Sequence, residues 1–322
     1  MKVLVVGGAG YIGSHTVLEL LSNKHEVVVF DDLSTGHIEF IPNGVRFYKG
    51  SLTNKEDLKN VFDKEKSFSC VMHFAAKIVV PASMADPLLY YHNNVEGVRL
   101  LLEQVRDYKV PFVIFSSSAA VYGEPSTGEC FENDPKLPIN PYGETKLVCE
   151  NMIKWCSKAY GFKYINFRYF NVAGADSKLR VGQWNKVYTH LIPICTETML
   201  GKRDKLTIAG NDYKTSDGTN IRDYIHVEDL AKAHVIGLHY LISGGPSDDF
   251  NLGSNVGFSV YEVAKECNKI MPMKYDFGPR RGGDPDKLIA NSRKALEILG
   301  FRPEKTLKEM IKSDLDYRKS LK

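Results

Sequence analysis

Residues 7–13, with the sequence GGAGYIG, constrain the fold of this chain more than any other stretch. The apolar run at 3–6 directly before them predicts a strand buried on both faces, as in a parallel sheet. An amphipathic helical pattern follows from about residue 11 to residue 22. Glycines at such a strand-to-helix turn allow a tight turn and let the backbone approach a pyrophosphate at the helix N-terminus. The sequence therefore predicts a dinucleotide-binding βα unit here.

Strand-like and helix-like segments then alternate through the first half of the chain. Apolar runs at 27–30, 45–48, 71–74 and 112–115 predict further buried strands, with helical patterns near 54–62 and 88–108 between them. This alternation predicts an α/β fold with a doubly wound parallel sheet of the Rossmann type. The regular pattern stops near residue 170. We expect a cofactor-binding Rossmann domain at 1–170 and a smaller mixed α/β substrate-binding lobe at 171–322, whose late segments return to the main sheet.

An acidic residue closes the second predicted strand. Asp31 stands 18 residues beyond Gly13, where a carboxylate accepts hydrogen bonds from the adenosine ribose. Its charge repels a 2′-phosphate, and residues 32–36 hold no arginine to bind one, so NAD is predicted rather than NADP. After the fourth strand, Phe74 is followed by Ala75 and Ala76, two small residues that allow close approach of a cofactor.

Three features suggest redox chemistry. The serines 116–118 end the fifth predicted strand, and Tyr142 and Lys146 lie four residues apart at the start of a helix, on one helical face. A tyrosine is a poor base at neutral pH, but a neighbouring ammonium and a positive nicotinamide ring favour its phenolate. Tyr142 is thus the candidate base, with Lys146 and Ser118 as its partners.

Composition excludes several other classes of protein. The net charge of +3 over 322 residues is too small to indicate a nucleic acid or an anionic membrane as partner. Six cysteines form no C-x-x-C pair, and no histidines show metal-ligand spacing, so we expect reduced thiols and no metal. The first residues lack the features of a signal peptide, and a cytoplasmic location is expected.

The chain resembles the extended short-chain dehydrogenases/reductases that act on nucleotide sugars and, among them, the UDP-glucose 4-epimerases. The resemblance covers most of the chain and is carried by residues 7–13, 116–123 (SSSAAVYG), 141–146, 168–174 (RYFNVAG), 210–229 and 279–284 (PRRGGD). It implies an isomerase that interconverts UDP-glucose and UDP-galactose at C4 through a 4-keto sugar, with tightly bound NAD as hydride store. It also implies a homodimer, with helices near 88–108 and 142–160 as candidate interface.

The resemblance extends the candidate sites residue by residue. On the cofactor side they are Gly7, Gly10, Tyr11, Ile12, Gly13, Asp31, Asp32, Ser51, Leu52, Phe74, Ala75, Ala76, Asn93, Ser116, Tyr142, Lys146 and Phe170. On the substrate side they are Ser118, Tyr142, Asn171, His190, Leu191, Thr207, Ile208, Ala209, Arg222, Tyr224, Arg281 and Asp284. Arginine suits the diphosphate among these because its planar fork binds oxygens bidentately.

This sequence departs from the family pattern at three places. Ser51 stands where relatives often carry an aspartate that contacts adenine, and His190 stands where some carry asparagine. Leu288 falls where some carry a bulky tyrosine beside the sugar, and the smaller residue would leave room for an N-acetyl group. An epimerase for another UDP-sugar (UDP-GlcNAc/GalNAc or UDP-xylose/arabinose) is therefore an alternative.

Two further alternatives are less favoured. A nucleotide-sugar dehydratase needs an acid–base pair after the serine of the fifth strand, but Ala119 and Ala120 occupy those positions and cannot transfer protons. A catalytically silent NAD-binding regulator would be expected to lack Tyr142 or Lys146, and both are present. His226, in the run 223–227 (DYIHV), is interpreted as a structural histidine.

Overall fold

The computed structural model describes residues 1–185, 187–280 and 284–321. Its main sheet has seven strands in the order β11-β7-β5-β4-β1-β2-β3. Neighbouring strands from β3 through β1 to β7 all run parallel. The strands are β1 (Lys2–Val6), β2 (Glu26–Asp31), β3 (Arg46–Lys49), β4 (Cys70–His73), β5 (Phe112–Ser118), β7 (Lys163–Tyr169) and β11 (Asp248–Leu252). The predicted Rossmann-type sheet is confirmed.

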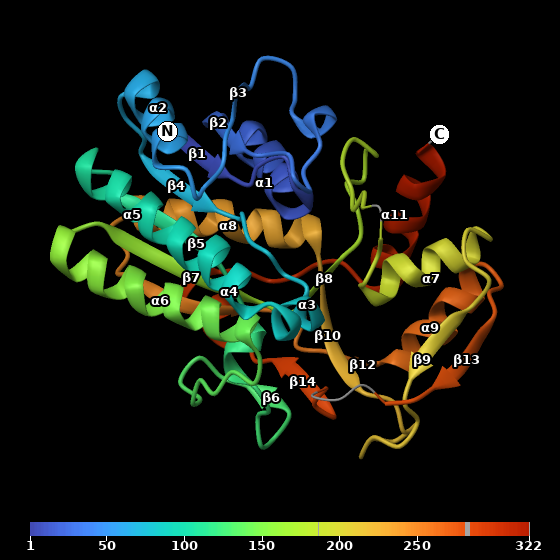
Figure 1. Ribbon diagram of the computed structural model, residues 1–322. Helices are drawn as coiled ribbons and strands as arrows, with labels where there is room; N and C mark the ends of the chain where they lie inside the picture. The colour runs from blue at the N-terminus through green and yellow to red at the C-terminus, as the bar shows by residue number, and fades with distance from the viewer. Residues whose placement is uncertain (186, 281–283, 322) are drawn as a thin grey trace. The chain divides into compact units, whose positions relative to one another are not determined.

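Helices cover both faces of this sheet. Apolar residues of α2 (Lys55–Glu65), α5 (Gly97–Asp107) and α6 (Pro141–Tyr160) form one core with the side chains that β1, β2, β4 and β5 direct to that face (Figure 1). On the other face, Gly237 of α8 (Val227–Ile242) approaches Ile165 and Phe167 of β7. Helix α1 (Tyr11–Ser22) follows β1, as predicted, and the 3₁₀ turns Ile38–Phe40 and Ala119–Tyr122 follow β2 and β5.

The single helix expected near residues 88–108 is interrupted. After α3 (Val80–Ala85), the chain forms α4 (Pro87–Tyr90), then a π-helical segment, Tyr91–Glu96, and only then α5. Asn94 within this segment is 2% exposed, and its amide bonds the backbone N–H and C=O of Lys77 and the hydroxyl of Thr145. The wider π turn directs Asn94 inward to make these bonds.

A second group of elements is built from later segments. Strands β12 (Gly257–Ser259), β10 (Ile221–His226), β14 (Lys287–Ala290) and β6 (Glu129–Cys130) form a sheet that also includes β8 (Asn171–Ala173), while β9 (Leu206–Ala209) pairs in parallel with β13 (Tyr275–Gly278). Helices α7 (Leu191–Met199), α9 (Val260–Ile270) and α11 (Leu307–Ser320) enclose a second apolar core with β10, and α10 (Arg293–Leu299) follows β14.

The chain divides into two compact units that are not continuous in sequence. The first consists of Met1–Gly123, Pro135–Tyr169 and Ala231–Phe250, and the second of Glu124–Asp134, Phe170–Leu230 and Asn251–Lys322. Helix α8 and strand β11 each begin in one unit and end in the other. Late residues thus complete the main sheet, while a short early segment belongs to the second unit.

Candidate active site

The glycine turn lies where the strand order of the main sheet reverses. Strand β1 has β2 on one side and β4 on the other, which is the switch point where ligands bind in doubly wound sheets. Gly7 has a φ of +80°, and a Cβ on it would lie 2.6 Å from the backbone nitrogen of Ala75. A Cβ on Gly13 would lie 2.2 Å from the Gly7 oxygen. Only glycine fits either position.

The turn presents the start of α1 without a side-chain cap. Gly10 is the N-cap residue and, having no side chain, makes no side-chain cap bond to the first turn of the helix, which begins with Tyr11 and Ile12. Uncapped N–H groups together with the helix dipole form a site for a phosphate group. The glycine cradle and this helix end therefore fit the pyrophosphate of a dinucleotide.

Asp31 is the last residue of β2, as predicted, and is tied to the glycine turn. Its two carboxylate oxygens accept hydrogen bonds from Ala9 N (3.0 Å) and Leu33 N (2.8 Å). Burial raises the pKa of Asp31, and the two backbone N–H groups act against that rise. Each oxygen keeps a further lone pair, which suits a ribose hydroxyl. Neighbouring Asp32 accepts a bond from Ser34 N and shapes the following turn.

The other candidate cofactor residues of the first unit differ in how accessible their side chains are to a cofactor. Ser51 follows β3 and shares a hydrogen bond with the Thr53 hydroxyl, whereas Leu52 is 8% exposed and packs in the apolar core. Phe74 and Ala76 follow β4, and the ring centroid of Phe74 lies 4.9 Å from that of His234. Asn93 lies in the π-helical segment. The contacts of these residues with a cofactor stay predictions.

The three candidate catalytic residues meet where β5 ends and α6 begins. The hydroxyl of Ser118, the last residue of β5, hydrogen-bonds to the phenol of Tyr142. Lys146 Nζ donates to the carbonyl oxygen of Ser116 at 2.7 Å. The side chain of Asn140 caps α6 by accepting from Gly143 N at 2.9 Å, which fixes Tyr142 in the first helical turn. Tyr142 and Lys146 thus lie on one face of α6, in agreement with their spacing, and their catalytic roles stay predictions.

The charge states at this cluster differ from the simple expectation. Burial raises the pKa of Tyr142, and the bond from Ser118 only partly opposes that rise. The Lys146 nitrogen is engaged with Ser116 and lies 6.0 Å from the centre of the Tyr142 ring. The predicted lowering of the Tyr142 pKa is therefore absent in the protein alone, because desolvation outweighs the ammonium. With NAD bound next to Tyr142, the positive charge of the nicotinamide ring would favour the phenolate.

Lys146 should give the activity an alkaline limit. Burial lowers the pKa of its ammonium to about 8, while Cys149 and Glu150 act in the opposite direction. The ammonium is lost as the pH rises through that value, so kcat/KM is expected to fall above about pH 8. A Lys146→Arg variant stays charged, and its residual activity should lack this fall. The check is a pH profile of both proteins between pH 6 and 10, and an unchanged alkaline limb in the variant would contradict the assignment.

In the second unit, an arginine and an aspartate form part of the candidate clamp for a diphosphate and its ribose. Arg222 on β10 donates through Nη1 to the carbonyls of Ile221 and Pro285, both at 2.8 Å. Its Nη2 lies 3.5 Å from Asp284 Oδ1 in an ion pair. This buried Nη2 has no hydrogen-bond partner among the described residues. An unsatisfied guanidinium nitrogen suits a phosphate oxygen. Arg281, the other predicted member, lies outside the described residues.

Asn171 and Tyr224 are register partners on β8 and β10. Asn171 Nδ2 donates to the Asp223 carbonyl at 3.0 Å, which leaves its side-chain oxygen as an acceptor. Tyr224 is 5% exposed and packs in the core of the second unit, and burial raises the pKa of its phenol. The structure thus shows Tyr224 as a residue of the apolar core, and its direct contact with a ligand stays a prediction. Phe170, which begins the second segment of this unit, is also buried, at 7% exposed.

Residues 207–209 form part of β9, the short strand expected to bind a base. Leu206 and Ile208 are buried, whereas Thr207 is exposed and Ala209 half-buried. Since β13 is the only strand that pairs with β9 in the described part of the chain, one edge of β9 keeps open backbone groups. Such an edge can hydrogen-bond the amide-like edge of a pyrimidine.

His190 precedes α7, whose first residue is Leu191. Its Nδ1 lies 3.0 Å from the Gln183 amide nitrogen, a donor, so Nε2 carries the ring proton. Burial lowers the pKa of His190, which keeps the ring neutral. It therefore presents an N–H donor in the position where some relatives have an asparagine amide.

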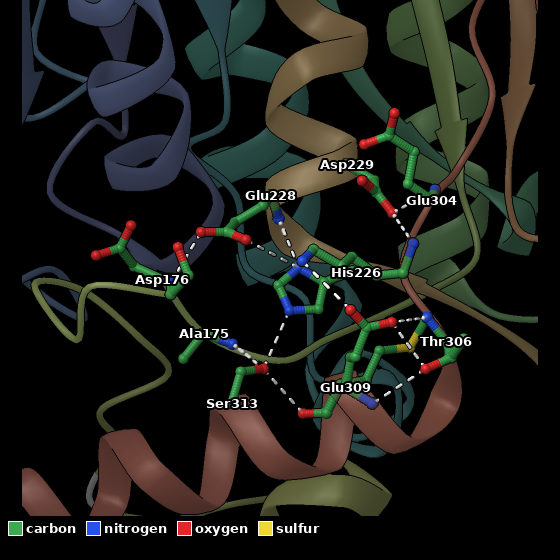
Figure 2. A network of polar contacts seen from close by, with 12 residues as sticks. Ala175, Asp176, His226, Glu228, Asp229, Glu304, Thr306, Glu309 and Ser313 are labelled. Atoms are coloured by element: carbon green, nitrogen blue, oxygen red, sulfur yellow. Dashed lines mark hydrogen bonds and ion pairs between the residues drawn. The ribbon is translucent and has the colours of Figure 1, made fainter.

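His226 is held by a hydrogen-bond network that runs from the end of β10 to α11 (Figure 2). Its Nδ1 accepts from Glu228 N at 3.1 Å, and its Nε2 lies 3.0 Å from Ser313 Oγ. That hydroxyl already donates to the Met310 carbonyl and accepts from Ala175 N. His226 Nε2 must therefore be the donor, which defines a neutral tautomer with both nitrogens engaged. The interpretation as a structural histidine fits this geometry.

Two neighbouring motif residues support the same architecture. A Cβ on Gly174, which has a φ of +87°, would lie 2.5 Å from His226 Nε2. Asp229 Oδ2 accepts from the backbone nitrogens of Glu304 and Lys305, directly before the capped start of α11 (Figure 2). These motif positions hold the second unit together.

Over the described residues, no group of three or more His, Cys, Asp or Glu side chains is arranged to hold a metal ion. Within the same ranges, no helix combines the length and apolar composition required to cross a membrane.

Comparison with known proteins decides the family. The model of the NAD dependent epimerase/dehydratase family matches residues 3–253. The chain belongs to this family. NAD is the cofactor that the family name states, in agreement with the glycine cradle and Asp31.

Several proteins and solved structures similar to this chain are named 4-epimerases of UDP-sugars. A UDP-glucose 4-epimerase of Lacticaseibacillus casei is 47% identical over 305 residues, covering 94% of this chain and 92% of that protein. The crystal structure of UDP-glucose 4-epimerase from Brucella ovis in complex with NAD has 40% identity and a TM-score of 0.94, covering 98% of each chain. The UDP-Glc/GlcNAc 4-epimerase of Campylobacter jejuni has 42% identity and a TM-score of 0.86, covering 99% of each chain.

Sequence reasoning missed one buried charged group in this member of the epimerase/dehydratase family. Arg168 begins the RYFNVAG motif but received no role, and it is 0% exposed. Glu150, two helical turns beyond Tyr142, is also 0% exposed and binds it. The sequence pattern predicts no strand around Arg168, so nothing marks this residue as buried; within the buried strand β7 it requires a buried partner.

Proposed function

We propose that this protein is a UDP-glucose 4-epimerase, which reversibly converts UDP-glucose and UDP-galactose with tightly bound NAD. The observation that carries the proposal is the cluster of Ser118, Tyr142 and Lys146 beside the carboxyl ends of the strands that form the NAD cradle. The similarity to the L. casei relative and to the NAD-bound B. ovis structure also supports the proposal.

The proposed mechanism assigns one task to each residue of the cluster. Tyr142 removes the proton from the sugar 4-hydroxyl, and Ser118 hydrogen-bonds the same oxygen and relays the proton. NAD, when bound, would accept the hydride that leaves C4 and return it to C4. The 4-keto sugar turns about its diphosphate link and presents its other face, and Tyr142 returns the proton as the opposite configuration forms. Lys146 orients the nicotinamide ribose and favours the phenolate of Tyr142.

This chemistry requires a firmly held nucleotide and a loosely held sugar. We assign the diphosphate to Arg222 and Asn171, since Arg222 carries a buried, unsatisfied guanidinium nitrogen, and we place Asp284 in the same clamp on the side of the ribose. The open edge of β9 suits uracil, which carries amide-like donors and acceptors. Arg281 remains in the proposal from its sequence motif alone.

The decisive experiment uses the purified protein without added NAD. Incubation with UDP-galactose should yield UDP-glucose at a steady rate, with no net oxidation. The same preparation, when denatured, should release NAD in an amount close to that of the protein. Turnover that depends strictly on added NAD would contradict the retained hydride store, and no conversion at all would contradict the proposed function.

A wider substrate range is a second candidate. Leu288 on β14 is half-buried and smaller than the tyrosine of some relatives, and the similar C. jejuni protein is named a UDP-Glc/GlcNAc 4-epimerase. We expect turnover of UDP-GalNAc, and a Leu288→Tyr variant should lose it while retaining UDP-galactose turnover. Absence of UDP-GalNAc turnover in the unaltered protein, with UDP-galactose converted normally, would refute this range.

The dehydratase and regulator alternatives receive no support. Ala119 and Ala120 lie in the 3₁₀ turn after β5, at the positions where a dehydratase needs an acid and a base. The silent regulator requires a cluster that cannot react, whereas Ser118, Tyr142 and Lys146 are all present and in contact with one another or with the same strand end.

We also propose a cytoplasmic homodimer. Large apolar side chains are exposed on the elements expected at the interface, with Leu88 of α4 at 78% and Trp155 of α6 at 69%. Large apolar side chains exposed on these helices suit burial in a protein interface. All six cysteines are free, as suits a reducing compartment. Light scattering after size exclusion should give twice the chain mass, and a monomer would contradict the dimer.

A further inference from the structure

The first unit contains a fully buried ion pair that the proposed chemistry does not use. Arg168 on β7 and Glu150 on α6 each have side chains with 0% exposure. Arg168 binds the carboxylate through two nitrogens, Nε at 3.0 Å and Nη2 at 2.7 Å. This is the bidentate geometry that an arginine makes with a carboxylate. Buried pairs are weak contributors to stability, so their presence calls for another reason.

One branch of this pair leads to the strand end that carries the catalytic serine. The Ser117 hydroxyl donates to Glu150 Oε1, and Ser117 directly precedes Ser118. Arg168 Nη1 bonds the hydroxyl of Tyr122 at 2.9 Å, at the end of the 3₁₀ turn that follows Ser118. The segment around Ser118 is thus held on both sides by the same ion pair.

The same pair also determines where α6 meets β5. Tyr142, Lys146 and Glu150 lie at intervals of four residues on one face of α6. Lys146 bonds the carbonyl of Ser116, and Glu150 accepts from the next residue along the strand, Ser117. Two successive turns of the helix are therefore fastened to two successive residues of the strand.

A second branch leads away from the candidate catalytic residues. Arg168 Nη2 also lies 2.9 Å from Asp249 Oδ2 on β11. Asp249 in turn binds Lys154 Nζ at 2.7 Å and the amide of Asn166 at 2.8 Å. The network pairs the cations Arg168 and Lys154 with the carboxylates Glu150 and Asp249, and the Lys136 ammonium lies beside it, 5.8 Å from the centre of the Tyr122 ring. The side chain of Lys154 is 38% exposed and marks its outer end.

We propose that the Arg168–Glu150 pair is a positioning device that aligns Ser118 with Tyr142 and Lys146, acting through Ser117 and Tyr122. The inference rests on the proposed catalytic cluster but adds residues outside it. The sugar hydroxyl must meet Ser118 and Tyr142 together, so a shift of the strand end against α6 misaligns the proton transfer. Small misplacements of this kind slow catalysis by one or two orders of magnitude.

The test uses substitutions that remove a single hydroxyl and leave the ion pair intact. The Ser117→Thr and Ser117→Val variants carry side chains of the same shape, but only threonine has a hydroxyl that can donate a hydrogen bond to Glu150. We expect Ser117→Val to lower kcat by about tenfold with little change in KM for UDP-galactose, and Ser117→Thr to retain most of kcat. Tyr122→Phe removes the other link and should lower kcat similarly, which keeps the test valid if a Ser117 variant fails to fold.

The matched control lies on the outer branch. Lys154→Met removes the bond to Asp249 but touches neither Ser117 nor Tyr122. It should lower the melting temperature slightly and leave kcat unchanged. Equal kcat for Ser117→Val and Ser117→Thr, or undiminished kcat in Tyr122→Phe, would overturn the proposal. A fall of kcat in Lys154→Met as large as in Tyr122→Phe would also overturn it, since that pattern indicates general destabilisation.

This test is separable from that of the proposed function. If the unaltered protein converts UDP-galactose and the hydroxyl variants do so at the same rate, the positioning role fails and the function stands. If the unaltered protein converts no UDP-sugar, the function itself fails.

Discussion

Tyr142→Phe is expected to lower kcat for UDP-galactose by about 10²- to 10⁴-fold, the usual contribution of a positioned acid–base group. The substitution removes only the phenolic oxygen, which hydrogen-bonds to Ser118. The ring and its packing at the start of α6 remain, so folding should persist. Most NAD should be retained, because the glycine cradle and Asp31 lie on other elements of the sheet and Tyr142 is only one of many candidate cofactor contacts.

The measurement compares kcat, KM and bound NAD in the variant with those of a matched tyrosine variant. Tyr48→Phe removes a phenol that bonds Glu65, away from the β5–α6 junction, at 2.8 Å. It should leave kcat unaltered. Near-normal turnover in Tyr142→Phe would show that another group removes the proton, and a comparable loss in Tyr48→Phe would show that the assay reports stability.

Gly13→Ala is expected to abolish tight retention of NAD. The new Cβ would lie 2.2 Å from the Gly7 oxygen and 2.9 Å from the Gly8 Cα, so the backbone turn must open. Overpacking of this kind costs roughly 1–3 kcal/mol. Since about 1.4 kcal/mol corresponds to tenfold in affinity, we expect NAD to bind about 10- to 100-fold more weakly. The purified variant should then depend on added NAD.

Gly10→Ala provides the graded control within the same turn. A Cβ there would lie 3.3 Å from the Gly7 oxygen, a close but tolerable contact. The affinity of Gly10→Ala for NAD should fall by less than about tenfold. Quantifying NAD released on denaturation, with NAD titrations of the stripped proteins, compares the two variants. Full retention of NAD by Gly13→Ala would contradict the cradle as the pyrophosphate site.

The sequence was most informative where structure is local. The segment from β1 through α1 to Asp31 could be predicted from the hydrophobic pattern, the glycine positions and a carboxylate at a strand end, because these signals all lie close together in the sequence. The pairing of Tyr142 with Lys146 likewise follows from helical spacing. Ser118 joins them because parallel strands share one carboxyl edge, where residues after a strand gather.

Other features depend on partners that are distant in sequence. The π turn near Asn94 is supported by bonds to Lys77 and Thr145, which local periodicity does not reveal. The charge state of Tyr142 depends on burial, which only the packed structure defines. The burial of Arg168 also escapes sequence analysis, because β7 was not predicted and Asp249, one partner of Arg168, lies 81 positions away.

The position of β11 at the edge of the main sheet has a consequence for the order in which the chain folds. During synthesis, β7 emerges with its outer row of N–H and C=O groups unpaired, because the strand beside it ends only at Leu252. An open edge of this kind can pair with another nascent chain. The outer edge of β7 thus stays unpaired while about 80 further residues are synthesised, which takes several seconds at ribosomal speed, until β11 can pair with it. Slow, long-range closure of this kind makes chaperone protection most valuable before β11 is made.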